Sequence, residues 1–168
     1  YKVVIIMPFM SQDFYPSPAK EIPPRSIRAV EFYEGALMAL DSLKSEGVSL
    51  FVNVFDAQRD TAAVKELLLK RELEEADMII GHISSAGIQL IAEYAKERKK
   101  AFISPFNSAP DLVENNPYYI QVNPPFDVHS DHIVKYSHNI ESDPEISRNP
   151  LEKNLIILAL KEDSTRVA

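Results

Sequence analysis

Two serine-containing segments, each following an apolar run, hold the residues whose types and spacing could do chemistry. Ser84 and Ser85 follow one such run, and Phe106 and Ser108 follow the next. Hydroxyl groups and the unpaired backbone N–H groups at the start of a helix bind anions such as a carboxylate or a phosphate. Serine is also a preferred helix cap and turn residue, so each segment alone is compatible with local capping. Together, at neighbouring strand ends, they favour a carboxylate-binding site.

Two other groups of polar residues have more than one interpretation. His129 and His132 lie three positions apart on a predicted helix and could place two imidazoles on one metal ion, although structural metal sites need four ligands and a solvated face is simpler. Asp56, Arg59 and Asp60 form a charged turn that either contacts a ligand or is solvated. We predict no metal site from these residues.

The motifs of common enzyme and cofactor sites are absent. The sequence has no cysteine, no GxGxxG or GxxxxGK[ST] pattern, and no GxSxG elbow around Ser85. His82 follows a buried run and is expected to be structural. A response regulator would carry an acidic pair after its first strand, where this chain has Met7, Pro8 and Phe9. We therefore predict a binding module without a cofactor, and not an enzyme.

The composition is that of a globular chain with an acidic surface. Apolar residues make up 45% and charged residues 26% of the 168 residues, and the net charge is −7. The densest basic run, at 96–100, ends a predicted helix and complements its dipole. No apolar run approaches the roughly 20 residues that span a bilayer. We therefore predict no nucleic-acid partner and no adsorption to anionic membranes.

Apolar runs alternate with segments of helical periodicity along the chain. Runs that are apolar throughout indicate strands covered on both faces, as in a parallel sheet. The fold class is therefore α/β, a Rossmann-like three-layer α/β/α arrangement with a mostly parallel sheet, in which ligands bind beyond the carboxyl ends of the strands. We expect strands at 2–7, 49–55, 77–80, 101–104, 118–122 and 154–160, and helices at 26–46, 61–74, 85–100 and 127–139.

The sequence makes specific predictions for the first helix and for the loop before it. The loop over 9–24 is rich in proline, which disfavours both helix and central strand, and long loops of this kind are often functional. Gly47 suits the left-handed position that closes the helix. The expected buried stripe of the helix consists of Val30, Tyr33, Leu37, Leu40 and Leu43.

The two serine segments resemble the leucine/isoleucine/valine-binding family of type I periplasmic binding proteins. The resemblance rests on 81–85 and 103–112, which are Gly-His-Ile-Ser-Ser and Ile-Ser-Pro-Phe-Asn-Ser-Ala-Pro-Asp-Leu, and extends through 28–37 and 116–124 to nearly the whole chain. It implies the N-terminal lobe of a two-lobed receptor that closes on its ligand.

The resemblance also implies residue roles. Ser85 and Ser108 match the hydroxyls that hold the α-carboxylate and α-ammonium of an amino acid, and Phe106 matches a backbone contact. Ser84 stands where some members have a disulfide cysteine, and it completes the expected ligand-binding set. No cofactor and no metal is implied.

We expect residues 1–150 to form the N-terminal lobe and 151–168 to begin the second lobe. The chain opens in a strand without a basic leader, so we expect a domain of a longer precursor. The strand at 154–160 is apolar on both faces, and we expect it either to pair with another copy as a homodimer or to be poorly ordered.

The implied function is an extracytoplasmic solute-binding lobe of an ABC-transporter-type receptor, in the periplasm or cell envelope. Its partners would be an amino-acid-like small ligand between two lobes and an ABC permease. The insertion after Phe9 is similar to that of envelope proteins joined to a peptidoglycan-binding module. The alternative function is therefore a cell-envelope interaction or scaffold domain linked to peptidoglycan, without a small ligand.

Overall fold

The computed structural model describes residues 1–14, 22–58 and 60–141 of the chain. The backbone divides into two compact units, residues 1–126 and 127–168, and each is described by itself. The expected domain boundary at 150 and the expected strand at 154–160, with its homodimer, lie outside the described residues.

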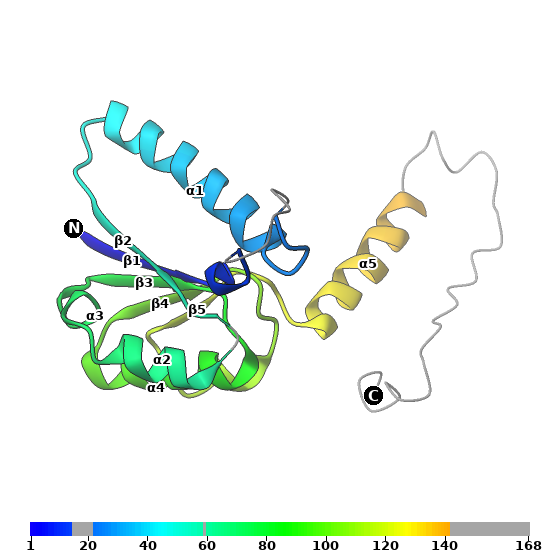
Figure 1. The fold of residues 1–168 in the computed structure, drawn as a ribbon. Coiled ribbons are helices and arrows are strands. Elements are labelled where there is room, and N and C mark those ends of the chain that lie inside the picture. The colour runs from blue at the N-terminus through cyan, green and yellow to red at the C-terminus, as the bar shows by residue number, and fades with distance from the viewer. Residues whose placement is uncertain (15–21, 59, 142–168) are drawn as a thin grey trace. The chain divides into compact units, whose positions relative to one another are not determined.

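The first unit is built on a five-stranded sheet in which every pairing is parallel (Figure 1). This confirms the predicted α/β class. The strand order is β2-β1-β3-β4-β5. Strand β1 therefore lies between β2 and β3, and β4 and β5 continue the sheet beyond β3. The strands are β1 Lys2–Met7, β2 Phe51–Asp56, β3 Met78–Gly81, β4 Ala101–Ser104 and β5 Tyr119–Gln121.

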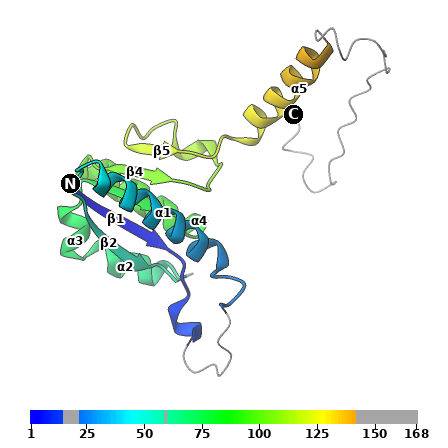
Figure 2. The ribbon, with the colours of Figure 1, turned by 90° about the horizontal axis from the view of Figure 1, so that it is seen from above.

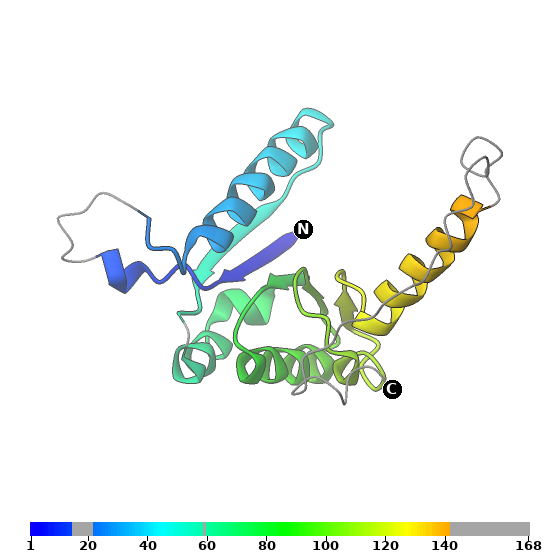
Figure 3. The ribbon, with the colours of Figure 1, turned by 90° about the vertical axis from the view of Figure 1, so that its right-hand side faces the viewer.

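Three helices cover one face of the sheet and form the larger core (Figures 1 and 3). They are α2 Thr61–Leu68, α3 Arg71–Glu75 and α4 Ser85–Arg98. Val4, Ile79 and Phe102 from the sheet pack there against Val64 and Ile91, and all five side chains are fully buried. The burial of both faces of β1 follows from its unbroken apolar sequence.

The helix expected over 61–74 is two helices. Asp60 caps the first helix, because its carboxylate accepts a hydrogen bond from Ala62 N at 2.9 Å. The chain breaks after Leu68, where Leu69 is 88% exposed and Lys70 is extended with ψ of 141°. A bend at this point lets Leu73 return to the core, where it is fully buried. A single straight helix would not bury both Leu67 and Leu73 in this way.

Helix α1, Ile27–Ser45, lies on the opposite face of the sheet (Figures 1 and 2). The predicted stripe was wrong at Leu37, which is 44% exposed; Ala29, Phe32 and Ala36 pack against the sheet instead. Ser26, the N-cap residue of the helix, is fully buried. Gly47 ends the helix with φ of 82°, as predicted.

The second unit contributes one described helix, α5 Phe126–Glu141, close to the predicted 127–139. Asp131 and Lys135 form an exposed ion pair on it at 3.9 Å. In the described parts of the chain, no group of three or more His, Asp or Glu side chains is placed to hold a metal. None of the described helices is both long and apolar enough to cross a membrane.

Replacing two helical glycines by alanine should have opposite effects on the stability of the protein. A Cβ atom at Gly35 in α1 meets nothing within 4 Å, whereas one at Gly87 in α4 collides with Ile83 Cγ2 and comes within 3.3 Å of Val64 Cγ2. Gly35→Ala should stabilise the protein by about 0.5–1 kcal/mol, because alanine loses less backbone entropy. Gly87→Ala should destabilise it by about 1–3 kcal/mol through overpacking. Urea unfolding of both variants measures the difference, and equal shifts would contradict the packing described at Gly87.

Candidate functional site

A pocket of about 640 Å³ lies at the carboxyl edge of the sheet, where β1 and β3 end. Its position is the one that the carboxyl-edge rule for parallel sheets predicts. It lies between the chain that leaves β1, the start of α1 and the loop that leads from β3 into α4. The lining residues are Pro8, Pro24, Arg25, Arg28, Ala29, His82, Ile83 and Ser84.

The start of α4 presents unpaired hydrogen-bond donors at this pocket. Ser84 is the N-cap residue, but its hydroxyl makes no capping hydrogen bond. The first bond inside the helix runs from Ile88 N to Ser84 O at 2.9 Å, so the N–H groups of residues 85–87 precede the helical ladder. Ser84 therefore does not serve as a side-chain cap, and its hydroxyl and the helix start remain available to an anion.

Phe106 connects the second serine segment to the first. Its ring lies edge-on to Phe32 at 5.6 Å and to His82 at 5.0 Å between centroids. The guanidinium carbon of Arg28 lies 5.7 Å from the centre of the same ring. The carbonyl of Phe106 accepts a hydrogen bond from Asn123 Nδ2 at 3.2 Å, so one of its two acceptor positions is used within the chain. Phe106 thus supports two residues that line the pocket.

Ser108 does not line this pocket and is exposed. Its neighbour Asn107 is held by Tyr119, whose hydroxyl accepts from Asn107 Nδ2 at 3.0 Å, and Asn107 Oδ1 accepts from Ala109 N at 3.2 Å. Ser85 begins α4. The structure therefore brings Ser84 and Phe106 to the region of one pocket but does not bring Ser108 into it, and the expected pairing of Ser85 with Ser108 stays a prediction.

Arg25 and Arg28 were not identified from the sequence. Arg25 lies in the turn just before α1 and Arg28 in the first turn of that helix, and both line the pocket. The carboxyl-edge rule points to the segment after β1, but the long proline-rich loop separates the two arginines from that strand end. The signal that could have found them is the pair itself, two guanidiniums three positions apart at a helix start.

The charged turn after β2 is structural. The Asp56 carboxylate accepts hydrogen bonds from Met10 N at 3.2 Å, from Ser11 N at 2.7 Å and from Gln58 N at 2.8 Å. Gln58 Nε2 adds a fourth bond at 2.7 Å. Met10 and Gln58 both have left-handed backbone, with φ of 56° and 50°. Asp56 thus anchors the beginning of the loop that returns to Arg25, while Arg59 lies outside the described residues.

The surroundings of His82 favour its neutral form. Burial lowers the pKa of its imidazole, and the positive charge of Arg28 lowers it further. Its Nδ1 atom is buried and has no hydrogen-bond partner in the described structure. A neutral imidazole can donate from one nitrogen and accept at the other, so His82 adds a polar group of either kind to the pocket wall.

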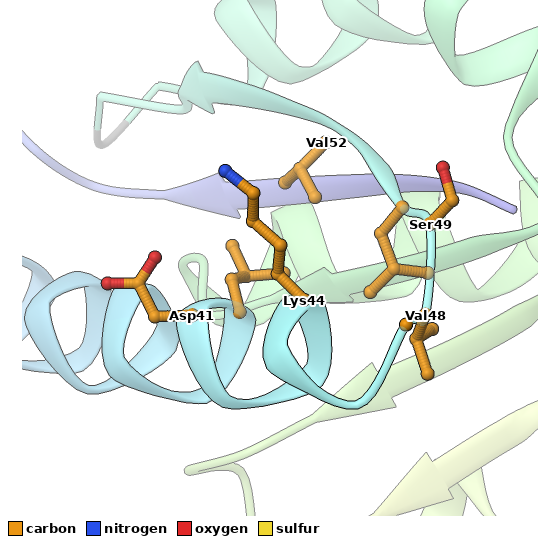
Figure 4. A pocket seen from close by; sticks show the side chains of 8 residues that line it. Asp41, Lys44, Val48, Ser49 and Val52 are labelled. Atoms are coloured by element: carbon orange, nitrogen blue, oxygen red, sulfur yellow. The ribbon is translucent and has the colours of Figure 1, made fainter.

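A second hollow of about 460 Å³ lies at the far end of α1 (Figure 4). Asp41 and Lys44 from the helix, Val48 and Ser49 from the chain entering β2, and Val52 from β2 itself surround it. It is at the amino edge of the sheet, where parallel α/β folds do not place their ligands. We therefore assign the candidate site to the carboxyl-edge pocket.

Comparison with solved structures shows similarity to bacterial binding proteins. The leucine-binding protein LivK of Thermotoga maritima matches over 82% of this chain, with a TM-score of 0.58 and 17% identity. An ABC transporter substrate-binding protein of Desulfitobacterium hafniense matches over the same share, with a TM-score of 0.58 and 14% identity. A structure of a Desulfitobacterium hafniense ABC transporter substrate-binding protein in complex with leucine has a TM-score of 0.57 and 16% identity. No protein-family model and no curated protein sequence matches the chain.

At these identities the similarity concerns the fold. The chain spans 37–38% of the length of these proteins. Its sheet and helices resemble one lobe of a type I periplasmic binding protein. This confirms the fold and the structural resemblance that the sequence predicted.

Replacing Asp56 should loosen the loop anchor. Burial by itself raises the pKa of this carboxyl, but the hydrogen bonds from Ser11, Gln58 and Met10 outweigh it and lower the pKa below 3.8. The anchor therefore stabilises the fold above pH 3.8, and the contribution is lost as pH falls through the folded-state pKa. Asp56→Asn should cost about 1 kcal/mol at pH 7.

Urea unfolding at pH 7 and below pH 3 tests this, with exposed Asp41→Asn as the matched control. The loss caused by Asp56→Asn should shrink at the lower pH. A loss of equal size at both pH values would show that the charge of Asp56 does not hold the loop.

The pKa of His82 should respond to Arg28. Arg28→Gln should raise it, because a positive charge is removed, but it should stay below 6.5 because burial is the larger cause. NMR titration of the His82 Cε1–H signal measures the value. Arg98→Gln, at the other end of α4, is the control and should leave it unchanged.

Proposed function

We propose that the chain is a lobe of an extracytoplasmic solute receptor of the ABC-transporter type, and that it holds the carboxylate of an amino-acid-like ligand. The observation that carries the proposal is the carboxyl-edge pocket, into which the start of α4 presents Ser84 without a capping bond. Unpaired N–H groups and a hydroxyl at a helix start are the groups that bind a carboxylate in proteins.

The similarity in fold supports the proposal. The matched proteins are named as a leucine-binding protein and as ABC transporter substrate-binding proteins, and one of them is in complex with leucine. A protein of this kind binds its solute outside the cytoplasm, so the proposed location is the periplasm or the cell envelope. The ligand would lie between two lobes, of which the described unit is one, and an ABC permease would be the downstream partner.

Within the proposed site, Ser84 and Ser85 at the start of α4 hold the carboxylate. Ser108 lies outside the described pocket, so its contribution from the neighbouring loop stays a prediction, while Phe106 supports both loops through its ring and its main chain. The contacts of Phe106 with His82 and Arg28 support this role, because they join the two loops at the pocket wall.

An envelope interaction domain linked to peptidoglycan is the second candidate function. The observation that favours it is the uncovered end of the α1-side face, where Ile120 is 47% and Val122 is 59% exposed. Apolar side chains left at the surface beside an edge strand are typical of protein-docking surfaces. A domain of this kind would bind a protein partner and no small ligand.

The serine assignment predicts a loss of affinity. Ser84→Ala, Ser85→Ala and Ser108→Ala should each weaken binding of a carboxylate ligand by roughly 1–3 kcal/mol, since each removes a hydrogen bond to a charged group. Ser42→Ala is the matched control, because its hydroxyl donates to Met38 O within α1.

A thermal-shift screen of amino acids, short peptides and peptidoglycan fragments provides the measurement. Ligand at one hundred times its dissociation constant should stabilise the protein by about 2.7 kcal/mol. A shift that survives all three substitutions would remove the site assignment. No shift with any compound would favour the interaction domain.

A further inference from the structure

The carboxyl-edge pocket carries more positive charge than recognition of one carboxylate requires. Arg25 and Arg28 both line it, beside the imidazole of His82, and no acidic side chain is among its lining residues. The whole chain has a net charge of −7, so a local concentration of cationic groups stands out against an acidic background. Such a site attracts anions that the rest of the surface repels.

The two arginines are held in place by the first turn of α1. Ser26, between them, is fully buried, and its N–H donates to Pro23 O at 2.8 Å. Its carbonyl accepts from Val30 N at 3.0 Å, which begins the helical ladder. Because this turn is fixed at Ser26, Arg25 and Arg28 reach the same pocket from either side of one buried residue.

Neither arginine is neutralised by the described parts of the chain. The ion pairs there involve other cations, at Lys2, Arg71, Arg98 and Lys135. Arg28 lies over the Phe106 ring, a contact that orients a guanidinium and leaves its in-plane N–H groups for other acceptors. Planar guanidinium groups bind carboxylate and phosphate oxygens through two parallel hydrogen bonds.

We propose that Arg25 and Arg28 form a second anion subsite, so that the ligand class is one with two anionic groups. The inference rests on the proposed function: one carboxylate binds at the start of α4, and a second carboxylate or phosphate group binds the two guanidiniums. His82 lines the same pocket and offers a hydrogen-bond donor or acceptor beside them. The pocket volume of about 640 Å³ is within the roughly 300–1,000 Å³ of small-molecule sites, so the pocket has room for one small ligand that carries both groups.

The test compares ligands that differ only in the second anionic group. Isothermal titration calorimetry of the full-length protein uses two pairs, L-glutamate with L-glutamine and O-phospho-L-serine with L-serine. In at least one pair the acidic member should bind roughly 10- to 100-fold more tightly, as expected for charge-assisted bonds to arginine. Arg25→Gln and Arg28→Gln should each reduce that ratio toward one, because each weakens binding of the acidic member more than binding of the neutral member.

Two further variants separate charge in the pocket from charge elsewhere. Lys44→Gln removes one positive charge from the other end of α1 and should leave the ratio unchanged. Arg28→Lys keeps the charge but not the paired hydrogen bonds, and it should keep only part of the preference. Circular dichroism and thermal unfolding establish that each variant is folded before it is titrated.

The outcomes are distinct. Equal affinity for both members of each pair would overturn the second subsite and leave the proposed carboxylate site standing. An acidic preference that the arginine variants keep would overturn the assignment to Arg25 and Arg28. Binding of no member of either pair would overturn this inference, and the proposed function would fall with it only if the thermal-shift screen also gave no shift with any compound.

Discussion

The burial of β1 on both faces is the constraint on which the rest of the first unit depends. Residues 3–7 of this strand are at most 5% exposed, and alternate side chains enter two separate cores. A strand without a solvated face must have a layer of helices on each side, and its parallel neighbours must be joined by crossovers. All strands then end at one edge, and the loops that leave them meet there.

The two faces of the sheet are covered unequally within residues 1–126. On one face, α2, α3 and α4 cover the larger core. On the other face, α1 is the only helix among the described residues of this unit, and an apolar hollow of about 460 Å³ lies between it and the sheet. A helix is about 10 Å wide and five strands extend over about 19 Å, so one helix covers only part of a face. The exposure of Ile120 at the far end of the sheet follows from this geometry.

The carboxyl-edge pocket combines three structural features that come from different parts of the chain. The start of α4 provides unpaired N–H groups, the first turn of α1 provides two guanidiniums, and Phe106 carries an aromatic ring between them. Asp56 holds the beginning of the intervening loop through four hydrogen bonds. Each feature by itself would bind an anion only weakly. Together in one pocket they are suited to an anionic ligand.

Local sequence determined the strands, the parallel class of the sheet, the Asp60 cap and the left-handed Gly47, because each depends on hydrophobic periodicity or on the chemistry of one residue. The edge that holds the pocket was also predictable, since it follows from parallel strands. Three features were decided only by the tertiary structure: the rotation of α1 that exposes Leu37, the place of Arg25 and Arg28 beside His82, and the position of Ser108 outside the pocket. These depend on how a helix settles on a sheet and where a long loop returns, and contacts between residues far apart in the sequence set both.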